Sequence, residues 1–270
     1  MGDVFNMNII VCVKAIPYVS EYIKLREDKK DIHRTKYVYK INDTDNNALE
    51  EALRIKEKIG GKVTVISISP KEEEDKVREI LWECLAKGAD HAIHIVDDLF
   101  KDIDSLTTAK IASKVIKNLS YDLILTGSEA LDDNLSVFGP ALAKFLNIPY
   151  STLVVNLEFK DKDIIVHREL DEGYKEVVKL KLPALLSIQS GINEPRYVSL
   201  LKVMRAKRKP IEVLTASDLG ITSEDLSNWK MLSVEKVEIP VRRRANIISG
   251  SLDEIASSLA KLIHEIIHGG

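Results

Sequence analysis

The stretch that decides the fold is residues 42–70, "NDTDNNALEEALRIKEKIGGKVTVISISP", where a helical pattern passes directly into a strand pattern. Asn, Asp and Thr at its start are residues that favour helix N-caps, and Gly60 and Gly61 end the helix. The apolar run that follows, closed by Pro70, is typical of a buried strand. The apolar positions of the helix recur at helical spacing: Ala48, Leu49, Ala52, Leu53 and Ile55.

The same alternation of strand and helix continues on both sides of this stretch. Strands at short spacing with intervening helices indicate a parallel sheet covered on both faces, so we expect an α/β fold with a doubly wound, mostly parallel, Rossmann-like sheet. The predicted strands are residues 7–14, 62–70, 90–96 and 121–127, and the predicted helices are residues 42–61, 74–89, 104–119 and 134–146.

After Pro149 the pattern changes. Residues 150–182 alternate as antiparallel strands with charged turns such as Lys160–Asp163, and residues 183–188 return as a buried strand. An amphipathic helix at residues 251–268 follows a basic connection around Arg242, Arg243 and Arg244. The sequence therefore predicts an α/β domain with an antiparallel insertion over 1–235 and a C-terminal helical arm over 236–270. Whether the arm packs on another chain or on its own domain is open at this point.

Composition excludes several classes of function. The 270 residues carry a formal net charge of -3, which gives no general attraction to nucleic acid. No apolar run reaches the length of a membrane-spanning helix. Cys12 and Cys84 lie in apolar segments without a CxxC motif, which indicates reduced core residues in a cytoplasmic protein. The histidines have no partners at metal-ligand spacing, so we expect no metal site.

The best candidate for a ligand site is "GSEALDDNLSVFG", residues 127–139. Ligands of open parallel sheets bind beyond the carboxyl ends of the strands, where the strand order reverses. Backbone N–H groups of residues 134–139, at the start of the next helix, would suit a phosphate. Alternatively, Asp132, Asp133 and Asn134 only cap that helix, and spacing alone does not decide between the two.

The common enzyme signatures are absent. The sequence after the first strand has no GxGxxG, and the chain has neither GxxxxGK[ST] nor GxSxG. The residues by themselves thus indicate a nucleotide-binding α/β protein without catalytic residues. A nucleotide-hydrolysing or nucleotidyl-transferring enzyme lacks its phosphate loop here, and a stand-alone nucleotide sensor of the stress-protein type would need neither the insertion nor the tail.

Several motifs in order match a known family. They are "VCVK" (11–14), "INDTDNNALEEALRIKE" (41–57), "LAKGADHAIHI" (85–95), "YDLILTGSEALDDN" (121–134), "HRELDEGYKEVVKLKLPALL" (167–186) and "NEPRYVSLLKVMRAKRK" (193–209). With these motifs the chain resembles the β subunit of electron transfer flavoprotein, from about Met7 to His268. The last motif is the most specific of the set.

The resemblance implies a heterodimer with the α subunit of electron transfer flavoprotein, an electron carrier rather than a catalyst on its own. FAD shared with the α subunit would take electrons from partner dehydrogenases, such as acyl-CoA dehydrogenase, and pass them to a quinone-reducing acceptor. The β subunit would bind AMP, or a second FAD in electron-bifurcating members.

Residues 127–140 depart from both forms of the family. Ordinary members have Asn-Gln-Thr where this chain has Ser136-Val137-Phe138, and bifurcating members have Gly where this chain has Asp133. Gly139-Pro140, typical of bifurcating members, is kept. AMP or FAD in this subunit is therefore open, with a slight preference for AMP.

The resemblance also implies which residues bind the nucleotide and which dock the dehydrogenase. Docking would use a recognition loop, residues 191–205, with Leu200 as an apolar anchor, although periodicity also allows Leu200 to be a core residue of a helix starting near Ser199. The implied nucleotide-binding residues are Cys12, Asn42, Asp43, Thr44, Asp45, Ile68, Gly127, Ser128, Glu129, Ala130, Leu131, Asp132, Asp133, Asn134, Leu135, Ser136, Val137, Phe138 and Gly139. The implied docking residues are Glu194, Pro195, Arg196, Tyr197, Leu200 and Met204.

Overall fold

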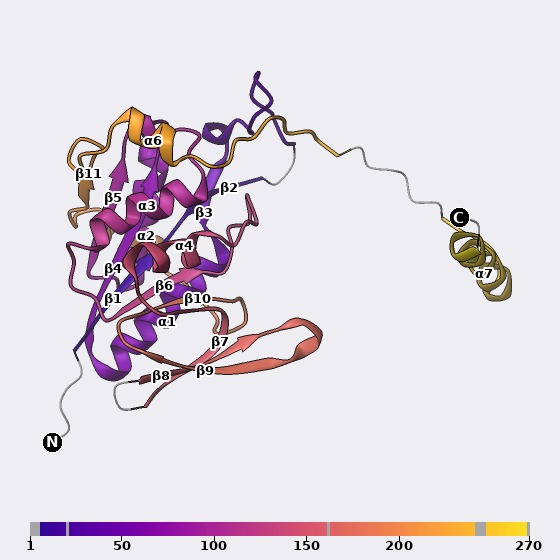
Figure 1. Ribbon diagram of the computed structural model, residues 1–270. Helices are drawn as coiled ribbons and strands as arrows, with labels where there is room; N and C mark the ends of the chain where they lie inside the picture. The colour runs from indigo at the N-terminus through magenta and orange to yellow at the C-terminus, as the bar shows by residue number, and fades with distance from the viewer. Residues whose placement is uncertain (1–5, 20–21, 161–162, 241–246, 269–270) are drawn as a thin grey trace. The chain divides into compact units, whose positions relative to one another are not determined.

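The computed structural model describes residues 6–19, 22–160, 163–240 and 247–268 (Figure 1). The chain divides into two compact units, one ending at Lys236 and the other beginning at Val237. The first unit holds the sheet and its covering helices. The second unit, as far as its residues are described, holds one helix and is treated separately below.

Within the described residues, the first unit is built on a nine-stranded sheet in the order β11-β5-β4-β1-β6-β10-β7-β8-β9. All neighbours from β11 to β7 are parallel, and β8 and β9 extend the sheet as antiparallel strands. The predicted fold class is therefore confirmed. The strands are β1 (Met7–Cys12), β4 (Gly61–Ser69), β5 (His91–Val96), β6 (Leu123–Gly127), β7 (Tyr150–Lys160), β8 (Asp163–Glu169), β9 (Lys175–Lys181), β10 (Ala184–Ile188) and β11 (Glu212–Leu214).

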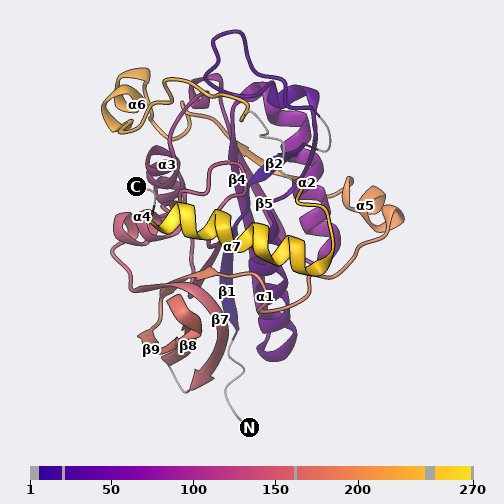
Figure 2. The same ribbon diagram turned by 90° about the vertical axis from the view of Figure 1, so that its right-hand side faces the viewer.

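The central strands read as continuous apolar runs because helices cover both faces of the sheet. Helices α1 and α2 cover one face and α3 and α4 the other (Figure 2). Val11 and Val65 pack toward the first face, Ile10 and Ile66 toward the second, and all four are buried. The helices of this unit are α1 (Asp43–Ile59), α2 (Glu74–Lys87), α3 (Ser105–Ile116), α4 (Phe138–Leu146), α5 (Leu200–Ala206) and α6 (Ser223–Trp229).

Local signals account for several of the helix ends. α1 stops at Gly60, whose φ of 82° is readily adopted only by glycine. α3 starts at Asp104, whose carboxylate accepts the Thr107 N–H at 2.7 Å. The capping box of Thr222 and Asp225 starts α6. The signals at Gly60 and Asp104 were read in the sequence, which is why the predicted end of α1 and the predicted start of α3 agree with the observed ones.

Several elements of the first unit were not predicted. A small antiparallel pair joins β2 (Ala15–Tyr18) to β3 (Val38–Ile41), at the two ends of the polar segment after the first strand. β11 and α6 follow residues 191–205 and were also missed. The predicted charged turn at Lys160–Asp163 falls partly outside the described residues, at positions 161–162.

The second unit contains α7 (Leu252–His268), and the predicted amphipathic helix is confirmed. At its start, the N–H and the hydroxyl of Ser251 both donate to Glu254 Oε2, at 2.7 and 2.9 Å. None of the described residues of α7 is buried, and Leu252, Ile266 and Ile267 are strongly exposed. The basic connection at Arg242–Arg244 lies outside the described residues.

None of the helices in the described part of the chain combines the length and the apolar character that crossing a bilayer requires. Both cysteines are buried and unpaired, as the sequence predicted. Burial raises the pKa of Cys12 above its ordinary value and that of Cys84 to about 12, so both thiols are held protonated.

Candidate functional site

The strand order reverses between β1 and β6, because the chain moves from β1 to β4 on one side and later places β6 on the other. One buried carboxylate joins the two strand ends. Asp45, in the first turn of α1, accepts the backbone N–H of Lys14 at 2.8 Å and that of Gly127 at 2.8 Å. The switch point of the sheet, where the strand order reverses, is thus bridged by the Asp45 side chain of α1, the helix that follows β1 and β3 in sequence.

The start of α1 also holds the β6–α4 loop, residues 128–137. Asn42 donates from Nδ2 to the Glu129 carbonyl at 2.7 Å and accepts the Leu131 N–H at 3.1 Å. Thr44 donates its hydroxyl to the same Glu129 carbonyl at 2.7 Å. Asn42 precedes α1 but does not cap it with its side chain, because that side chain is engaged by the loop.

The acidic residues of the loop are neutralised by cations from two other segments. Asp132 accepts from Lys14 Nζ at 2.6 Å and from Arg34 Nη1 at 2.8 Å. Asp133 accepts from Lys14 Nζ at 3.0 Å. Burial acts to raise the pKa of Asp132, but Lys14 and Arg34 outweigh it and hold that pKa below its usual range. Lys14 and Arg34 thus bring two positive charges to the loop.

The loop is longer and the next helix shorter than predicted. α4 begins at Phe138, four positions after the predicted start at Asn134, and no side chain caps it. Asn134 and Ser136 have left-handed φ values of 50° and 54°. The prediction that Asp132, Asp133 and Asn134 cap α4 is wrong, because Asp132 and Asp133 are drawn to Lys14 and the chain turns twice before the helix starts.

Two glycines let these segments approach closely. A Cβ at Gly127 would lie 2.3 Å from Asp45 Oδ1 and 2.3 Å from Thr44 Oγ1. A Cβ at Gly139 would lie 2.8 Å from Thr126 Oγ1, so a larger residue there would require that hydroxyl to move. A methyl group at Gly127 would displace the start of α1, because it also meets the Asp45 backbone N at 2.9 Å.

Of the predicted nucleotide residues outside the loop, Cys12 and Ile68 lie at the carboxyl edge of the sheet, whereas Asp43 points elsewhere. Cys12 and Ile68 lie on the same face of the sheet near its carboxyl edge, since Cys12 pairs with Ile66 and Ile68 is two residues further along β4. Asp43 does not face the loop: its carboxylate is more than half exposed and pairs with Lys40 at 2.8 Å.

A hollow of about 620 Å³ adjoins the β6–α4 loop. That volume falls within the range of about 300–1,000 Å³ that is common for small-molecule sites. Six of its eleven lining residues carry hydroxyl groups, and its one guanidinium, that of Arg168, donates to the Thr152 carbonyl and hydroxyl and to Glu176. The lining residues are Ser128, Ser136, Pro140, Tyr150, Ser151, Thr152, Leu153, Arg168, Glu176, Val178 and Ser187.

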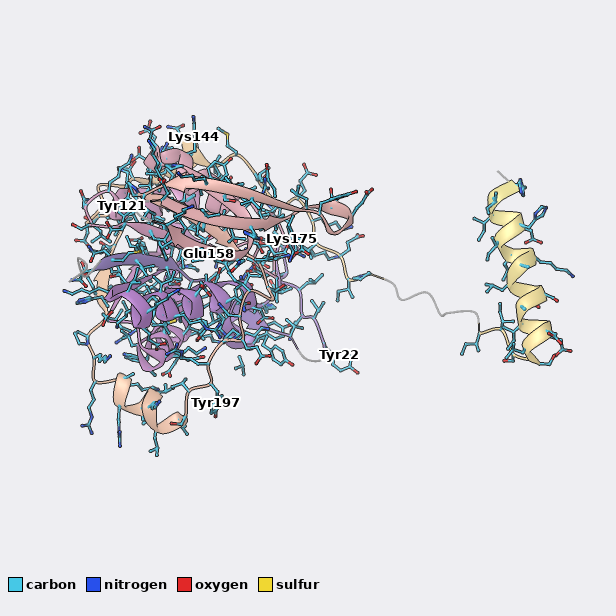
Figure 3. The ribbon with its side chains drawn as sticks, turned by 90° about the horizontal axis from the view of Figure 1, so that it is seen from below. Tyr22, Tyr121, Lys144, Glu158, Lys175 and Tyr197 are labelled. Atoms are coloured by element: carbon cyan, nitrogen blue, oxygen red, sulfur yellow. The ribbon has the colours of Figure 1, made fainter. Side chains whose placement is uncertain are left out.

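The predicted docking residues lie on and before α5, on the outer side of α2 (Figure 2). Leu200 is 73% exposed, so the alternative that it is a core residue is wrong. Tyr197, which Figure 3 shows projecting beside α5, is 90% exposed. Met204 and Leu201 are exposed next to them, and Leu201 was not predicted. We call Tyr197, Leu200, Leu201 and Met204 the apolar patch.

Two of the predicted docking residues, Arg196 and Glu194, contact residues of α1 and are not part of the apolar patch. Arg196 turns toward α1 and pairs with Glu50 at 2.8 Å and Glu57 at 2.6 Å. The Glu194 carbonyl accepts from Arg54 at 3.4 Å. These contacts hold the chain before α5 rather than extend the apolar patch.

Sequence reasoning missed three charged residues around these sites. Lys14 stands directly after the first strand in "VCVK", a position where strand ends meet ligands, and this was a usable signal. Arg34 lies in a polar segment without a pattern. Glu50 sits on a predicted helix face where solvated surface is the ordinary expectation, yet it is only 4% exposed.

The buried carboxylate of Asp45 makes stability depend on pH. Burial raises its pKa to about 7, against the lowering effect of the Lys14 and Gly127 N–H groups. The unfolded value is about 3.9, so the folded chain holds the proton more tightly between about pH 4 and pH 7. The free energy of unfolding contributed by Asp45 therefore falls as pH rises through this window.

We expect the stability advantage of the wild type over Asp45→Asn to be larger at pH 5 than at pH 7.5, by about 2–3 kcal/mol. Denaturant unfolding of both proteins at the two pH values measures it. Parallel pH profiles for wild type and variant would show that Asp45 does not titrate in this window.

Comparison with known proteins agrees with this architecture. The family model of the electron transfer flavoprotein domain matches residues 31–219. The chain is 35% identical over 264 residues to the electron transfer flavoprotein subunit beta of Methylophilus methylotrophus, covering 96% of this chain and 98% of that one. It is 36% identical to the subunit beta of Thermoanaerobacterium thermosaccharolyticum, with the same coverage. It is 33% identical to the caffeyl-CoA reductase-Etf complex subunit CarD of Acetobacterium woodii, again covering 96% and 98%.

The doubly wound sheet with its closed switch point is thus that of an electron transfer flavoprotein domain. The chain belongs to the electron transfer flavoprotein β-subunit family. Family membership implies an electron-transport role in a flavoprotein and an α subunit as partner.

Proposed function

We propose that this chain is the β subunit of a heterodimeric electron transfer flavoprotein that binds an adenine nucleotide at the β1–β6 switch point. The observation that carries the site is the network of Asn42, Thr44 and Asp45, which fixes the β6–α4 loop over the carboxyl ends of β1 and β6. The site lies where open α/β sheets bind ligands. The FAD shared with the α subunit supplies the redox chemistry, and this chain supplies position and electrostatics.

AMP is our first choice of nucleotide. Lys14 and Arg34 neutralise Asp132, so the loop does not present uncompensated negative charge to a phosphate. Backbone N–H groups at the loop and at the start of α4 are donors that survive the loss of the family's Asn-Gln-Thr side chains. The nucleotide would lie against Cys12 and Ile68 on the second face of the sheet.

FAD in this subunit, as in electron-bifurcating members, is the second choice. Two observations favour it: Gly139-Pro140 is kept, and the hollow beside Ser128 and Ser136 extends the space next to the loop. Arg168 in that hollow would face the part of a dinucleotide that lies beyond the AMP moiety.

The apolar patch is the docking surface for the partner dehydrogenase, for which acyl-CoA dehydrogenase is the type expected from the family, and electrons leave to a quinone-reducing acceptor. Exposed aromatic and aliphatic side chains surrounded by polar residues are typical of docking surfaces. The C-terminal arm, residues 236–270, contacts the α subunit through the apolar residues of α7. Exposed Leu252, Ile266 and Ile267 are the anchors of that contact.

The test is co-expression of this chain with its α subunit, followed by absorption spectroscopy and mass analysis of the nucleotides released on denaturation. We expect a yellow complex with one FAD and one AMP per heterodimer. Two FAD and no AMP would select the bifurcating form. A complex with one FAD and no second nucleotide would overturn the nucleotide site.

The arm is tested in the same system with a chain that ends at Lys236. We expect the shortened chain to be lost from the α subunit on purification, because the exposed face of α7 is its contact. Co-purification at unchanged yield would contradict this role of the arm.

A further inference from the structure

The segment before the apolar patch is held against the outer side of α1 by polar contacts. Asn193 donates from Nδ2 to the Asn47 carbonyl at 3.0 Å and to Glu51 at 2.9 Å. Asn47 in turn donates to the Asn193 carbonyl at 2.9 Å. This pair fixes the backbone three residues before Arg196.

Arg196 then forms a fork on two carboxylates of α1. Its Nε and Nη2 donate to Glu50 Oε2 and Oε1 at 2.8 and 3.1 Å. Its Nη1 and Nη2 donate to Glu57 at 2.6 and 3.2 Å. The backbone N–H of Arg196 donates to Glu50 as well, at 3.1 Å. Main chain and side chain of one residue are thus both fixed by the same carboxylate.

Glu50 is unusual for a carboxylate on a helix exterior, since its side chain is only 5% exposed. Its oxygens accept from Arg196 three times and from Arg54 Nε at 3.0 Å. Burial acts to raise the pKa of Glu50, but the Arg196 and Arg54 donors outweigh it and hold that pKa below its usual range. Glu50 is therefore ionised, and removing its charge leaves a guanidinium without its buried partner.

The other end of residues 197–206, which carry the apolar patch, is held by α2. Lys207, directly after α5, donates to Glu79 at 2.6 Å and lies 5.3 Å from the centre of the Trp82 ring. Ala206 at the end of α5 is buried in the core. The apolar patch lies between these two attachments, so its position is set by Arg196 on one side and by Lys207 and Ala206 on the other.

We propose that Glu50 is a positioning residue for docking: through Arg196 it holds the segment so that Tyr197 and Leu200 are presented to the dehydrogenase in one arrangement. This rests on the proposed docking function of the apolar patch. A preordered surface loses less conformational entropy on binding, so loosening it weakens association without altering the flavin chemistry.

The test uses the complex with the α subunit and measures flavin reduction against dehydrogenase concentration. For Glu50→Gln, which keeps the shape but removes the charge, we expect the apparent KM for the dehydrogenase to rise about tenfold with kcat at saturation unchanged. Flavin and nucleotide content stay at wild-type values. Hydrogen exchange at residues 197–206 becomes faster.

A matched control is Arg26→Lys, which weakens a similar fork, on Asp28 and Asp102, away from α5. We expect it to leave the KM unchanged. Arg196→Lys is the second variant on the proposed fork, and it serves if Glu50→Gln does not fold. Because Lys cannot form the bidentate contact, Arg196→Lys should also raise the KM.

Three outcomes would overturn the proposal. An unchanged KM in Glu50→Gln and Arg196→Lys, with a raised KM in Leu200→Ala, would refute positioning while docking stands. A fall in kcat with no change in KM would assign Glu50 a structural role only. An unchanged KM in Leu200→Ala as well would refute the docking surface and the positioning role together.

Discussion

Gly127→Ala is expected to expel the nucleotide and to destabilise the protein by about 3 kcal/mol or more. The added methyl group would lie 2.3 Å from both Asp45 Oδ1 and Thr44 Oγ1 and 2.9 Å from the Asp45 N. The start of α1 must then move, and Asp45 can no longer accept from both strand ends. Thermal unfolding and nucleotide content of the purified complex measure the two effects.

Gly220→Ala is the control for the general effect of adding a methyl group to a glycine. Gly220 has a left-handed φ of 59° and nothing within 4 Å of the new Cβ, so the expected cost is only the backbone term, about 1 kcal/mol. Nucleotide content should not change. Full nucleotide occupancy and an unshifted Tm in Gly127→Ala would refute the close packing on which the site depends.

Leu200→Ala is expected to weaken docking of the dehydrogenase about thirtyfold, which corresponds to about 2 kcal/mol for truncating an interface anchor. Because Leu200 is 73% exposed, its truncation removes little packing within the chain. The Tm of the complex should therefore stay unchanged. The rate of flavin reduction at sub-saturating dehydrogenase is the measurement.

Leu99→Ala provides the comparison, since Leu99 is a partly exposed leucine at 40% exposure that is not part of the apolar patch. It should leave the rate of flavin reduction at the wild-type value. If Leu200→Ala kept the wild-type rate, or lowered the Tm instead, the docking surface would have to be placed elsewhere.

The central fold could be predicted because burial on both faces leaves a plain record in the sequence. In "NIIVC" and "VTVISIS", β-branched and other apolar residues predominate since both faces of these strands are covered, and Gly60 and Gly88 mark helix ends by their positive φ. β11 has only three residues at the sheet edge, too few for a pattern. β2 and β3 pair across a long polar segment, and pairing at that separation has no local signal.

The position of the candidate site could be predicted where it follows from neighbouring residues in the sequence. It could not be predicted where it depends on contacts between residues far apart in the sequence. The loop after β6 follows from its place at a strand end. The start of α4 does not, because Asp132 is drawn to Lys14 and Arg34, which lie about a hundred residues away in sequence. For Leu200, helical periodicity permits either an exposed or a buried side chain, and only the packing of α5 on α2 decides.

Helix α1 serves two neighbours: its first turn holds the β6–α4 loop, and its outer side, with Asn47, Glu50 and Glu57, holds the segment before α5. Exchanging only residues 190–206 between two family members, in order to change dehydrogenase preference, would remove the contacts with α1 that hold this segment in place. A chimera that carries the matching α1 residues along with the exposed segment should recognise the donor's dehydrogenase, whereas a chimera with the segment alone should recognise neither partner well.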